Sequence, residues 1–561
     1  MNAEIGFRPW FEKYPELYKA QTDILKSAGF ILDEEVLKKF GRVEFLGRSK
    51  VEPDRQLRVV FPTAFPSSSP QIFDLPPSKL LSRHHLAHNR QLCIFGFGGS
   101  RWSATLTAAD ALKEADDLIT EFKNGSAFDL TAQPPEPVSH GLQYIPQSVI
   151  LVPPPISTFK DFAKLNLSTG WFLGRFVNQG DFQKGTNGRG IIYKAQFGNY
   201  ELNCDKPFSG YPENAGKQIN GKWFYLQNSP SIEELSEALK ACFLKCKSVS
   251  QSAFYWFAMI FPEESAKVGQ TRLTWLIVRA NAAGEFHRIL TLPYVQSERY
   301  ARIPGLEGLE EKTVTILGCG SLGSKIASNL AATGVNRFHL IDHDYFEPGN
   351  TVRHELGVES FGLPKALALL SRLSSLNPLV ATNSDHFLFQ AASIAPLEHE
   401  KTFFGFVKQS DLIIDATGFH FASHFVNELS FELNVPALYA SVTNGAWGGE
   451  VVRAVPSKTP CWLCWVDQYY EITPPSAPNS IAEIFAPGCD QPTFTGTTYD
   501  LGFVASLATS MAVETLLSGK MQPDFERNYI RWSGKDENGK QLFLTEILST
   551  TTRQGCELCG R

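Results

Sequence analysis

The sequence predicts a multidomain α/β protein whose C-terminal part is a doubly wound parallel sheet. Three observations support this prediction. The chain has 561 residues, which at roughly 100 to 200 residues per domain gives about three domains. Its composition, 43% hydrophobic and 20% charged, is typical of packed globular cores. From residue 295 onwards, a strand, a glycine turn, a helix and a second strand follow one another, which is the order found in doubly wound sheets.

Composition and charge also exclude several classes of protein. The 52 Lys and Arg against 58 Asp and Glu give a formal net charge of −6, which argues against a non-specific nucleic-acid binder. The longest apolar runs, such as residues 273–278, are far shorter than the ~20 residues that span a bilayer, so no membrane partner is expected. The first residues lack the apolar core of a secretory signal. We therefore expect a cytoplasmic protein whose ten cysteines are reduced.

The N-terminal segment, residues 1–140, is predicted to be an α+β domain. A helical stretch at residues 12–30 precedes strand-like stretches at 41–49 and 56–62 and a proline-rich loop. Cys93 then follows a His-rich loop and precedes a glycine-rich turn and a helix. A single cysteine in such a strand-like context is more often part of a core than catalytic.

Residues 141–294 are predicted to form a mixed α/β domain, introduced by proline-rich stretches. A helix is expected where Ser231 and Glu234 fit a capping box. Cys242 and Cys246 lie on this helix and are expected to be buried thiols. The segment has no polar cluster that suggests chemistry, so a recognition or spacer role is the modest interpretation.

The C-terminal segment, residues 295–561, carries a Gly-x-Gly-x-x-Gly turn between a strand and a helix, which predicts a Rossmann-like unit. Gly318 and Gly320 let the backbone approach a phosphate at the helix N-terminus. Asp342 ends the second strand and can bind ribose hydroxyls. This motif alone also fits an NAD-binding unit, so an NAD-dependent oxidoreductase is an alternative interpretation.

Cationic side chains in the next loops favour a triphosphate over a dinucleotide. Asn350, Arg353 and Lys365 lie just beyond the second strand, and a triphosphate about to be cleaved needs its charge neutralised. The third strand is predicted to end in Asp415. Each of these residues by itself is more often a solvated loop residue. The prediction of a nucleotide triphosphate site therefore depends on their joint placement.

Two C-x-x-C pairs in the same segment predict a structural zinc site. Two thiolates separated by two residues can bind one metal ion, and two such pairs complete the four-sulfur shell that Zn²⁺ prefers. Four sulfur ligands leave no open position for catalysis. A redox dithiol or a chance pair is the alternative. The predicted ligands are Cys461, Cys464, Cys556 and Cys559.

Cys489 lies on a Pro/Gly-rich loop before a helical stretch at residues 500–517. A thiol near the start of a helix can have a lowered pKa, which increases the thiolate fraction available for attack. Cys489 is therefore predicted to be a nucleophile, with a buried structural cysteine as the alternative.

Several motifs occur in order along the C-terminal segment: RYARIPGLEGLEEKTVTILGCGSLG, LIDHDYFEPGNTVRHELG, GLPK, LIIDATG and PCWLC with CELC. Together they resemble the ThiF/MoeB-type adenylation domain of ubiquitin-activating enzymes and of bacterial enzymes that adenylate sulfur carriers. The resemblance implies use of ATP and Mg²⁺ and frequent homodimerisation. Asp415 matches a family acid that helps to hold magnesium, but Gly418 replaces the family's second acid. The residues that match the family's ATP-binding positions are Gly318, Gly320, Asp342, Asn350, Arg353, Lys365 and, for the partner subunit's ATP, Arg302.

Two further resemblances concern the cysteines outside the zinc set. Cys489 resembles the catalytic cysteine that some activating enzymes carry in the crossover loop of this domain. The N-terminal order of helix, strand meander, proline loop, Cys93, Trp102 and helix resembles ubiquitin-conjugating enzymes, with Cys93 at their thioester position. The family's His-Pro-Asn is absent, which leaves His85 and Asn89 as candidates for stabilising the oxyanion.

The whole arrangement resembles the fused activating and conjugating proteins of bacterial CBASS antiphage operons. That resemblance implies adenylation of a partner's C-terminal carboxylate, a thioester relay from Cys489 to Cys93, and conjugation to a target lysine. The implied carboxyl donor is the C-terminal tail of a cGAS-like nucleotidyltransferase (CD-NTase). A ubiquitin-like protein or a sulfur carrier is the alternative donor.

Overall fold

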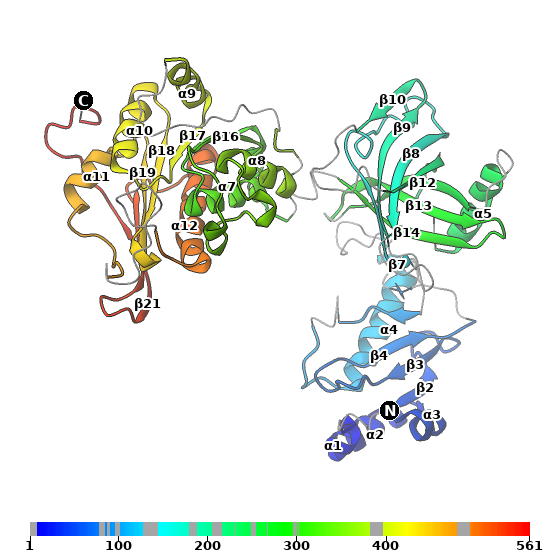
Figure 1. Ribbon diagram of the computed structural model, residues 1–561. Helices are drawn as coiled ribbons and strands as arrows, with labels where there is room; N and C mark the ends of the chain where they lie inside the picture. The colour runs from blue at the N-terminus through cyan, green and yellow to red at the C-terminus, as the bar shows by residue number, and fades with distance from the viewer. Residues whose placement is uncertain are drawn as a thin grey trace. The chain divides into compact units, whose positions relative to one another are not determined.

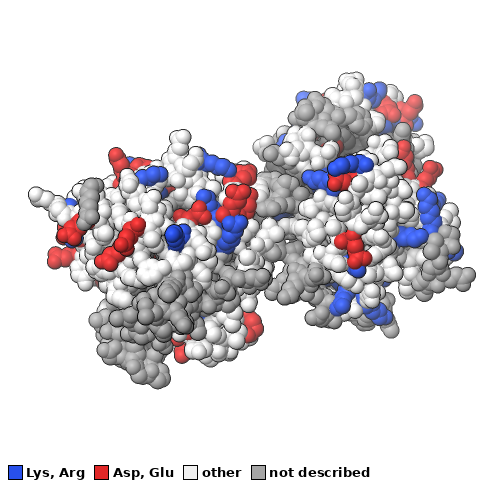
Figure 2. Space-filling model, turned by 90° about the horizontal axis from the view of Figure 1, so that it is seen from above, with Lys and Arg blue, Asp and Glu red and all other residues white. Residues whose placement is uncertain are grey.

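The computed structural model divides the chain into two units, Met1–Pro207 with Pro212–Ala301, and Phe208–Tyr211 with Arg302–Arg561 (Figure 1). Among the described helices, none combines the length and apolar character that a membrane span needs. On the face seen in Figure 2, cationic and anionic side chains of the described residues are interspersed. The described residues are 8–77, 85–86, 90–95, 101–126, 144–178, 188–204, 216–230, 232–247, 254–265, 268–294, 300, 302–377, 379–381, 397–478 and 494–560.

The first sheet of unit 1 is antiparallel, with the strand order β1-β2-β3-β4-β6-β5. The buried residues of α4 recur every three or four positions from Ala108 to Ile119, because one face of this helix packs into the core. The Ala108 N–H donates to Gln21 Oε1 on α2 at 2.7 Å, which joins the two helices. The elements are α1 (Trp10–Lys13), α2 (Pro15–Ser27), β1 (Ile31–Leu32), α3 (Glu34–Phe40), β2 (Glu44–Arg48), β3 (Gln56–Val60), β4 (Gln71–Asp74), β5 (His85–Leu86), β6 (Gln91–Leu92) and α4 (Ala108–Asn124).

The second sheet of unit 1 closes on itself as a barrel. Its order is β10-β9-β7-β14-β13-β12-β11-β8, and β8 also pairs with β9. The elements are β7 (Tyr144–Val152), β8 (Thr169–Asn178), β9 (Gly188–Phe197), β10 (Tyr200–Asn203), β11 (Lys217–Tyr225), α5 (Ile232–Lys247), β12 (Phe254–Glu264), β13 (Thr271–Asn281) and β14 (Phe286–Pro293).

Strand β12 shows why this part is richer in strands than the mixed α/β prediction suggested. Its alternate residues enter two cores, with Ala258 and Ile260 in one and Phe257 and Met259 in the other, since successive side chains of a strand point to opposite faces. The second core also contains buried residues of α5. Cys242 on that helix is buried, as is Cys246, so the prediction of buried thiols is confirmed.

Unit 2 contains one sheet of seven strands in the order β16-β15-β17-β18-β19-β20-β21. The first four are parallel and the last three pairings are antiparallel. The predicted order of strand, glycine turn, helix and strand is confirmed by β15, α7 and β16. The strands are β15 (Thr313–Leu317), β16 (Arg337–Ile341), β17 (Leu412–Asp415), β18 (Ala437–Val442), β19 (Gly448–Ala454), β20 (Tyr529–Lys535) and β21 (Gln541–Leu548).

Helices cover both faces of this sheet, as the doubly wound prediction requires. One core lies under α7, α8 and α12, and a second lies under α9, α10 and α11 (Figure 1). Because β15, β16 and β17 are parallel, their carboxyl ends meet at one edge, where ligands bind in such sheets. The helices are α7 (Ser321–Thr333), α8 (Lys365–Leu376), α9 (Leu397–Gln409), α10 (His420–Leu433), α11 (Trp462–Tyr469), α12 (Thr498–Leu516) and α13 (Ser518–Met521), and short 3₁₀ turns include η6 (Pro348–Val352).

Candidate functional site

The glycine turn packs closely against the loop that follows β17. Gly318 has a φ of +83°, and a Cβ on it would lie 2.8 Å from the Ala416 carbonyl oxygen. A Cβ on Gly323 would lie 1.8 Å from the Gly318 carbonyl oxygen. Side chains at these two positions are therefore excluded, and the first turn of α7 approaches the sheet edge with its backbone N–H groups free to face a ligand.

A cavity of about 270 Å³ opens at this edge, beside the glycine turn. The free N–H groups and dipole of the α7 N-terminus favour an anion there. The cavity also receives one lysine ammonium, from Lys365 at the start of α8. We call it the nucleotide cavity. Its lining residues are Leu317, Gly318, Gly320, Ile341, Asp342, His343, Asp344, Lys365, Ala416, Thr417, Phe419 and Ala422.

Asp342 is held in place by two backbone hydrogen bonds at the end of β16. Its Oδ2 accepts from the Cys319 N–H at 2.7 Å and its Oδ1 accepts from the Asp344 N–H at 2.8 Å. Burial raises the pKa of this carboxyl, while the charge of Lys365 and the two N–H donors oppose the shift. The carboxylate is thus fixed against the glycine turn, with lone pairs left for hydroxyl donors such as those of a ribose.

Asp344 is a cavity residue that the sequence analysis missed. Lys365 Nζ lies 2.5 Å from Asp344 Oδ2, and the Lys365 N–H also donates to the Asp344 carbonyl oxygen at 2.9 Å. Burial raises the pKa of Asp344, but the bond from Lys365 and its charge outweigh this and hold the pKa below its usual value. The Asp-His-Asp motif at the strand end, with acids two positions apart, was the signal that could have identified it.

Asn350 and Arg353 lie near this cavity in the chain but are not among its lining residues. Asn350 Oδ1 accepts from the Glu347 N–H at 3.1 Å and so caps η6. The half-buried Arg353 guanidinium lies 5.9 Å from the centre of the Phe494 ring, and burial lowers the pKa of this arginine. The structure therefore brings Gly318, Gly320, Asp342 and Lys365 together, whereas the roles of Asn350 and Arg353 toward a phosphate stay predictions.

His354 ties the Arg353 loop to the glycine turn, which the sequence analysis did not foresee. Its buried ring lies with Nε2 2.7 Å from the Cys319 carbonyl oxygen, and its Nδ1 accepts from the Leu356 N–H at 3.2 Å. Since Nδ1 accepts, Nε2 carries the proton and donates to Cys319. Burial lowers the pKa of His354 to about 4. This histidine is therefore a neutral support for the turn.

Asp415 lies at the end of β17, fully buried and strongly hydrogen-bonded. Its Oδ1 accepts from the Thr417 N–H at 3.0 Å and from Thr417 Oγ1 at 2.7 Å, and its Oδ2 accepts from Ser423 Oγ at 2.6 Å. Burial raises the pKa of Asp415, against the effect of these bonds. Within the described part of the chain, four cysteines are the only cluster of metal-ligating groups. The donor set at Asp415 thus does not make a magnesium site by itself.

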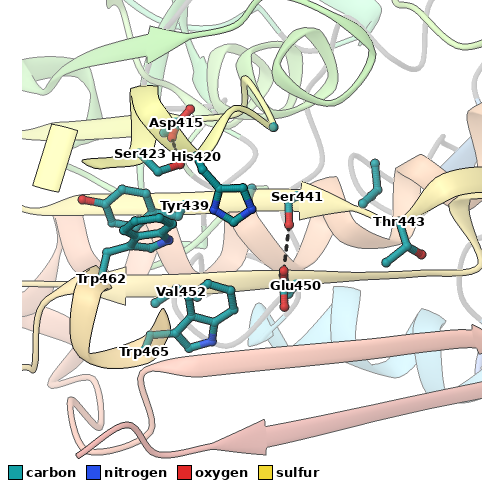
Figure 3. A pocket seen from close by; sticks show the side chains of 13 residues that line it. Asp415, His420, Ser423, Tyr439, Ser441, Thr443, Glu450, Val452, Trp462 and Trp465 are labelled. Atoms are coloured by element: carbon teal, nitrogen blue, oxygen red, sulfur yellow. Dashed lines mark hydrogen bonds between the residues drawn. The ribbon is translucent and has the colours of Figure 1, made fainter. Parts of the chain in front are cut away.

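A second cavity, of about 240 Å³, lies on the other side of the loop between β17 and α10 (Figure 3). This loop and the end of β17 lie between the two cavities, because Asp415 and Gly418 line the second cavity while Ala416 and Thr417 line the nucleotide cavity. Three aromatic side chains, two acids and several hydroxyls form its wall. Its lining residues are Asp415, Gly418, His420, Ser423, Tyr439, Ala440, Ser441, Val442, Thr443, Glu450, Val452, Trp462 and Trp465.

The four predicted zinc ligands come together although the two pairs are far apart in the chain. The sulfur atoms lie 3.7 Å (Cys461 to Cys464), 3.6 Å (Cys461 to Cys556), 3.4 Å (Cys464 to Cys559) and 3.5 Å (Cys556 to Cys559) apart. A tetrahedron with Zn–S bonds of ~2.3 Å has edges of roughly 3.8 Å, so the cluster fits Zn²⁺ closely. When bound, the ion would join the start of α11 to the end of the chain.

Cys93 follows β6 and is half-buried. A buried ion network lies beside the strand ends that precede it. The fully buried Asp74 Oδ2 accepts from Arg55 Nη1 at 2.7 Å and from Arg90 Nη2 at 3.3 Å, and Arg90 Nε donates to the Asp74 carbonyl oxygen at 2.9 Å. Arg55 Nε also donates to Glu52 Oε2 at 3.0 Å. The network therefore anchors the chain three residues before Cys93.

Some predicted residues cannot be placed against these features. Cys489 and Asn89 lie outside the described residues, as does the side chain of His85. Arg302 is described and exposed. The indole of Trp102 packs edge-on against Phe95, two residues after Cys93, with ring centres 5.1 Å apart.

Comparison with known proteins shows which family the C-terminal unit resembles. The model of the ThiF family matches residues 296–553. The sulfur carrier protein adenylyltransferase of Thermus thermophilus is 30% identical over 204 residues, which are 35% of this chain and 68% of that protein. The chain belongs to the ThiF family. The nucleotide cavity, the second cavity and the four cysteines all lie within or at the end of the ThiF segment.

Two further relatives add to this comparison. One aligns with nearly the whole chain, and the other is named for a ubiquitin transferase-like activity. The uncharacterized protein y4oA of Sinorhizobium fredii is 25% identical over 596 aligned positions, covering 98% of this chain and 97% of that protein. The ATP-dependent ubiquitin transferase-like protein Cap2 of Vibrio cholerae is 33% identical over 120 residues, which are 20% of this chain and 19% of that protein. The likeness to y4oA therefore includes the parts on the N-terminal side of the ThiF segment.

Proposed function

We propose that this protein adenylates the C-terminal carboxylate of a partner protein with ATP and passes the acyl group through Cys489 and Cys93 to an amine on a target. The observation that carries the first step is the nucleotide cavity of the ThiF segment, where Asp342, Lys365 and the N-terminus of α7 converge. An acid for ribose and positive charge for phosphates are what an adenylating site needs.

The proposed first step forms a mixed anhydride. A carboxylate oxygen of the partner attacks the α-phosphorus of ATP, and the bond to the bridging oxygen breaks to release pyrophosphate. Lys365 and the α7 N-terminus bind the phosphates, while His354 holds the glycine turn in place. Arg302 of a second copy and Arg353 supply further charge in this proposal. A magnesium ion bound to ATP would supply further positive charge at the phosphates; Asp415 by itself does not form a site for the ion.

The later steps are acyl transfers between sulfur atoms. The Cys489 thiolate attacks the acyl carbon and AMP leaves. The Cys93 thiolate then displaces the Cys489 thiolate. A target amine, such as that of a lysine, attacks the second thioester, loses a proton and expels the Cys93 thiolate, which leaves an amide. Support comes from the half-buried position of Cys93 and from the likeness to Cap2, which is named an ATP-dependent ubiquitin transferase-like protein. The proposed carboxyl donor is the one that the sequence resemblance implies, the tail of a cGAS-like nucleotidyltransferase in antiphage defence.

A gel assay tests the relay. The full-length chain is incubated with ATP, magnesium and a candidate donor, then separated without reductant. We expect a thiol-sensitive adduct that persists in Cys93→Ala and is absent in Cys489→Ala. Cys204→Ser serves as the matched control, because this half-buried thiol donates to the Pro154 carbonyl oxygen in unit 1, a bond that serine can also make. If donors that support ATP–pyrophosphate exchange form no adduct, the thioester steps are wrong.

A second candidate function stops at the adenylate. The match to the Thermus thermophilus protein, named a sulfur carrier protein adenylyltransferase, favours adenylation of a small carrier without the relay. The two candidates differ in one readout. Both predict pyrophosphate exchange that is unaffected in Cys489→Ala. A sulfur-carrier function predicts no adduct on Cys93, whereas the relay requires both thiols for conjugation.

A further inference from the structure

The second cavity is built to hold something other than the nucleotide. The loop after β17 and the start of α10 line both cavities, and the other walls of the second cavity come from β18, β19 and α11. Figure 3 shows the rings of Tyr439, Trp462 and Trp465 gathered to one side of Ser441 and Glu450. The ring centres of Trp462 lie 5.7 Å from those of Tyr439 and 6.0 Å from those of Trp465. The aromatic wall is therefore continuous.

The side chains that line this cavity include more acids than bases. Its acids are Asp415 and Glu450, and its one basic side chain is the exposed His420, which packs against Trp462 at the rim. Asp415 is already bound by Thr417 and Ser423. Glu450 is the acid left to meet a ligand: it accepts one hydrogen bond from Ser441 Oγ at 3.0 Å on Oε1 and one from Tyr529 on Oε2 at 3.1 Å.

The cationic neighbour of Glu450 is Arg531, which forms its ion pair with another acid, Glu546. Arg531 lies opposite Glu450 across β19 and β20, but its Nε and Nη2 both lie 2.8 Å from Glu546 Oε2 on β21. Among the described residues, no ion pair within 4.0 Å reaches Glu450. Burial raises the pKa of Glu450, against the effects of Ser441, Tyr529 and Arg531. A cation in the cavity would stabilise the ionised carboxylate.

A buried polar atom in the wall also lacks a partner. Tyr439 is 5% exposed, and its hydroxyl has no hydrogen-bond partner within the part of the chain that the structure describes. Leaving such a group unpaired costs about 1 to 3 kcal/mol. A bound peptide offers carbonyl oxygens that can accept from this hydroxyl, so the wall suits a peptide segment as well as a cation.

We propose that the second cavity binds a lysine or arginine side chain that lies a few residues before the C-terminus of the partner's tail. The aromatic rings pack against the methylene stem and the face of the cation, and Glu450 pairs with its charged end. Because the two cavities share one loop, a chain seated in the second cavity can direct its terminal carboxylate to the nucleotide cavity. The inference rests on the proposed function for the identity of the tail, and it adds which tails the site selects.

Peptides test this selectivity without any chemistry. The probes are N-acetylated heptapeptides of glycine and alanine with a free C-terminal carboxylate, carrying one arginine at each position in turn. The matched set carries citrulline, which has nearly the shape of arginine without its charge. Binding to the full-length chain is measured by calorimetry in the absence of ATP. At one or two positions, the arginine peptide is expected to bind about tenfold more tightly than its citrulline counterpart.

Two variants locate the effect. In Glu450→Gln the arginine preference should fall to less than about twofold, because glutamine keeps an oxygen that accepts from one of the two hydroxyls and an NH2 group that can donate to the other, but has no charge. In Glu428→Gln, which removes an exposed acid from α10 outside the cavity, the preference should stay. A thermal unfolding midpoint of Glu450→Gln equal to that of Glu428→Gln rules out misfolding as the cause.

Three results would overturn the inference: equal binding of arginine and citrulline peptides at every position, an arginine preference that survives in Glu450→Gln, or no binding of any peptide. Failure of the proposed function is a separate result, since it would be the absence of ATP–pyrophosphate exchange with peptides that do bind.

Discussion

The two candidate chemical centres of this chain place their buried charges differently. In the ThiF unit, Asp342 and Lys365 line an open cavity that a ligand could fill. Near Cys93, by contrast, the side chains of Arg55 and Arg90 both donate to the buried carboxylate of Asp74. The first arrangement leaves polar groups free for chemistry, whereas the second uses them to hold backbone.

Because of this difference, substitutions in the two places should have different main effects, one on the rate of the reaction and the other on the stability of the fold. Loss of Lys365 should reduce the reaction and change the unfolding free energy little, because its partner Asp344 is half exposed. Damage to a closed, buried network should lower stability first. Hydrogen exchange measured by mass spectrometry on the full-length chain can follow both units at once. Each prediction below disturbs one part and uses another as the reference.

The largest effect is expected from the four cysteines. Metal analysis should find one zinc per chain, and a chelator should raise hydrogen exchange in β19, α11 and β20 of the ThiF unit while β3 and β4 stay protected. Structural zinc contributes on the order of 10 kcal/mol to small metal-bound folds. Cys464→Ser should lose the metal and Cys204→Ser should keep it. An unchanged zinc content in Cys464→Ser would contradict the assignment.

Lys365→Met should reduce ATP–pyrophosphate exchange about 100-fold or more, since it removes the one lysine ammonium that lines the nucleotide cavity. Its partner Asp344 is half exposed, so the unfolding midpoint should change little. Lys312→Met is the matched control, because Lys312 also pairs with an aspartate, Asp411, at 3.0 Å but away from the cavity. Equal exchange rates in the two variants would remove Lys365 from the proposed site.

Arg90→Ala tests the buried ion network near Cys93. It removes the two hydrogen bonds from Arg90 to the buried Asp74, which should cost about 2 kcal/mol and raise hydrogen exchange in β3 and β4 but not in β15. Arg101→Ala removes an exposed pair with Glu114 in the same unit and should cost less than about 0.5 kcal/mol. Nucleotide affinity should be the same in both variants. A loss of nucleotide affinity in Arg90→Ala would show that the two centres are not independent.

How far the sequence could predict each centre depends on how local its geometry is. Gly318, Gly320 and Asp342 were predicted because the turn and the strand end that position them lie in one short stretch, and the C-x-x-C spacing likewise identifies a metal-binding turn. The second cavity was not predicted, because Tyr439, Glu450 and Trp462 meet only once β18 and β19 pair and α11 packs on them. The barrel closure depends in the same way on the pairing of β8 with β9.

His354 joins the two categories, since it is buried like the network near Cys93 but supports the nucleotide cavity. Its pKa is lowered from 6.5 to about 4, so the unfolded chain binds the extra proton first as the pH falls. Its contribution to stability is therefore present above pH 6.5 and is lost toward pH 4. Between pH 7 and pH 5.5 this loss should amount to about 1 kcal/mol.

His354→Gln keeps a donor for the Cys319 carbonyl oxygen and an acceptor for the Leu356 N–H but does not titrate. In denaturant unfolding at the two pH values, the variant should lose about 1 kcal/mol less than the wild type, whereas equal losses would mean that this histidine is not held neutral by the fold.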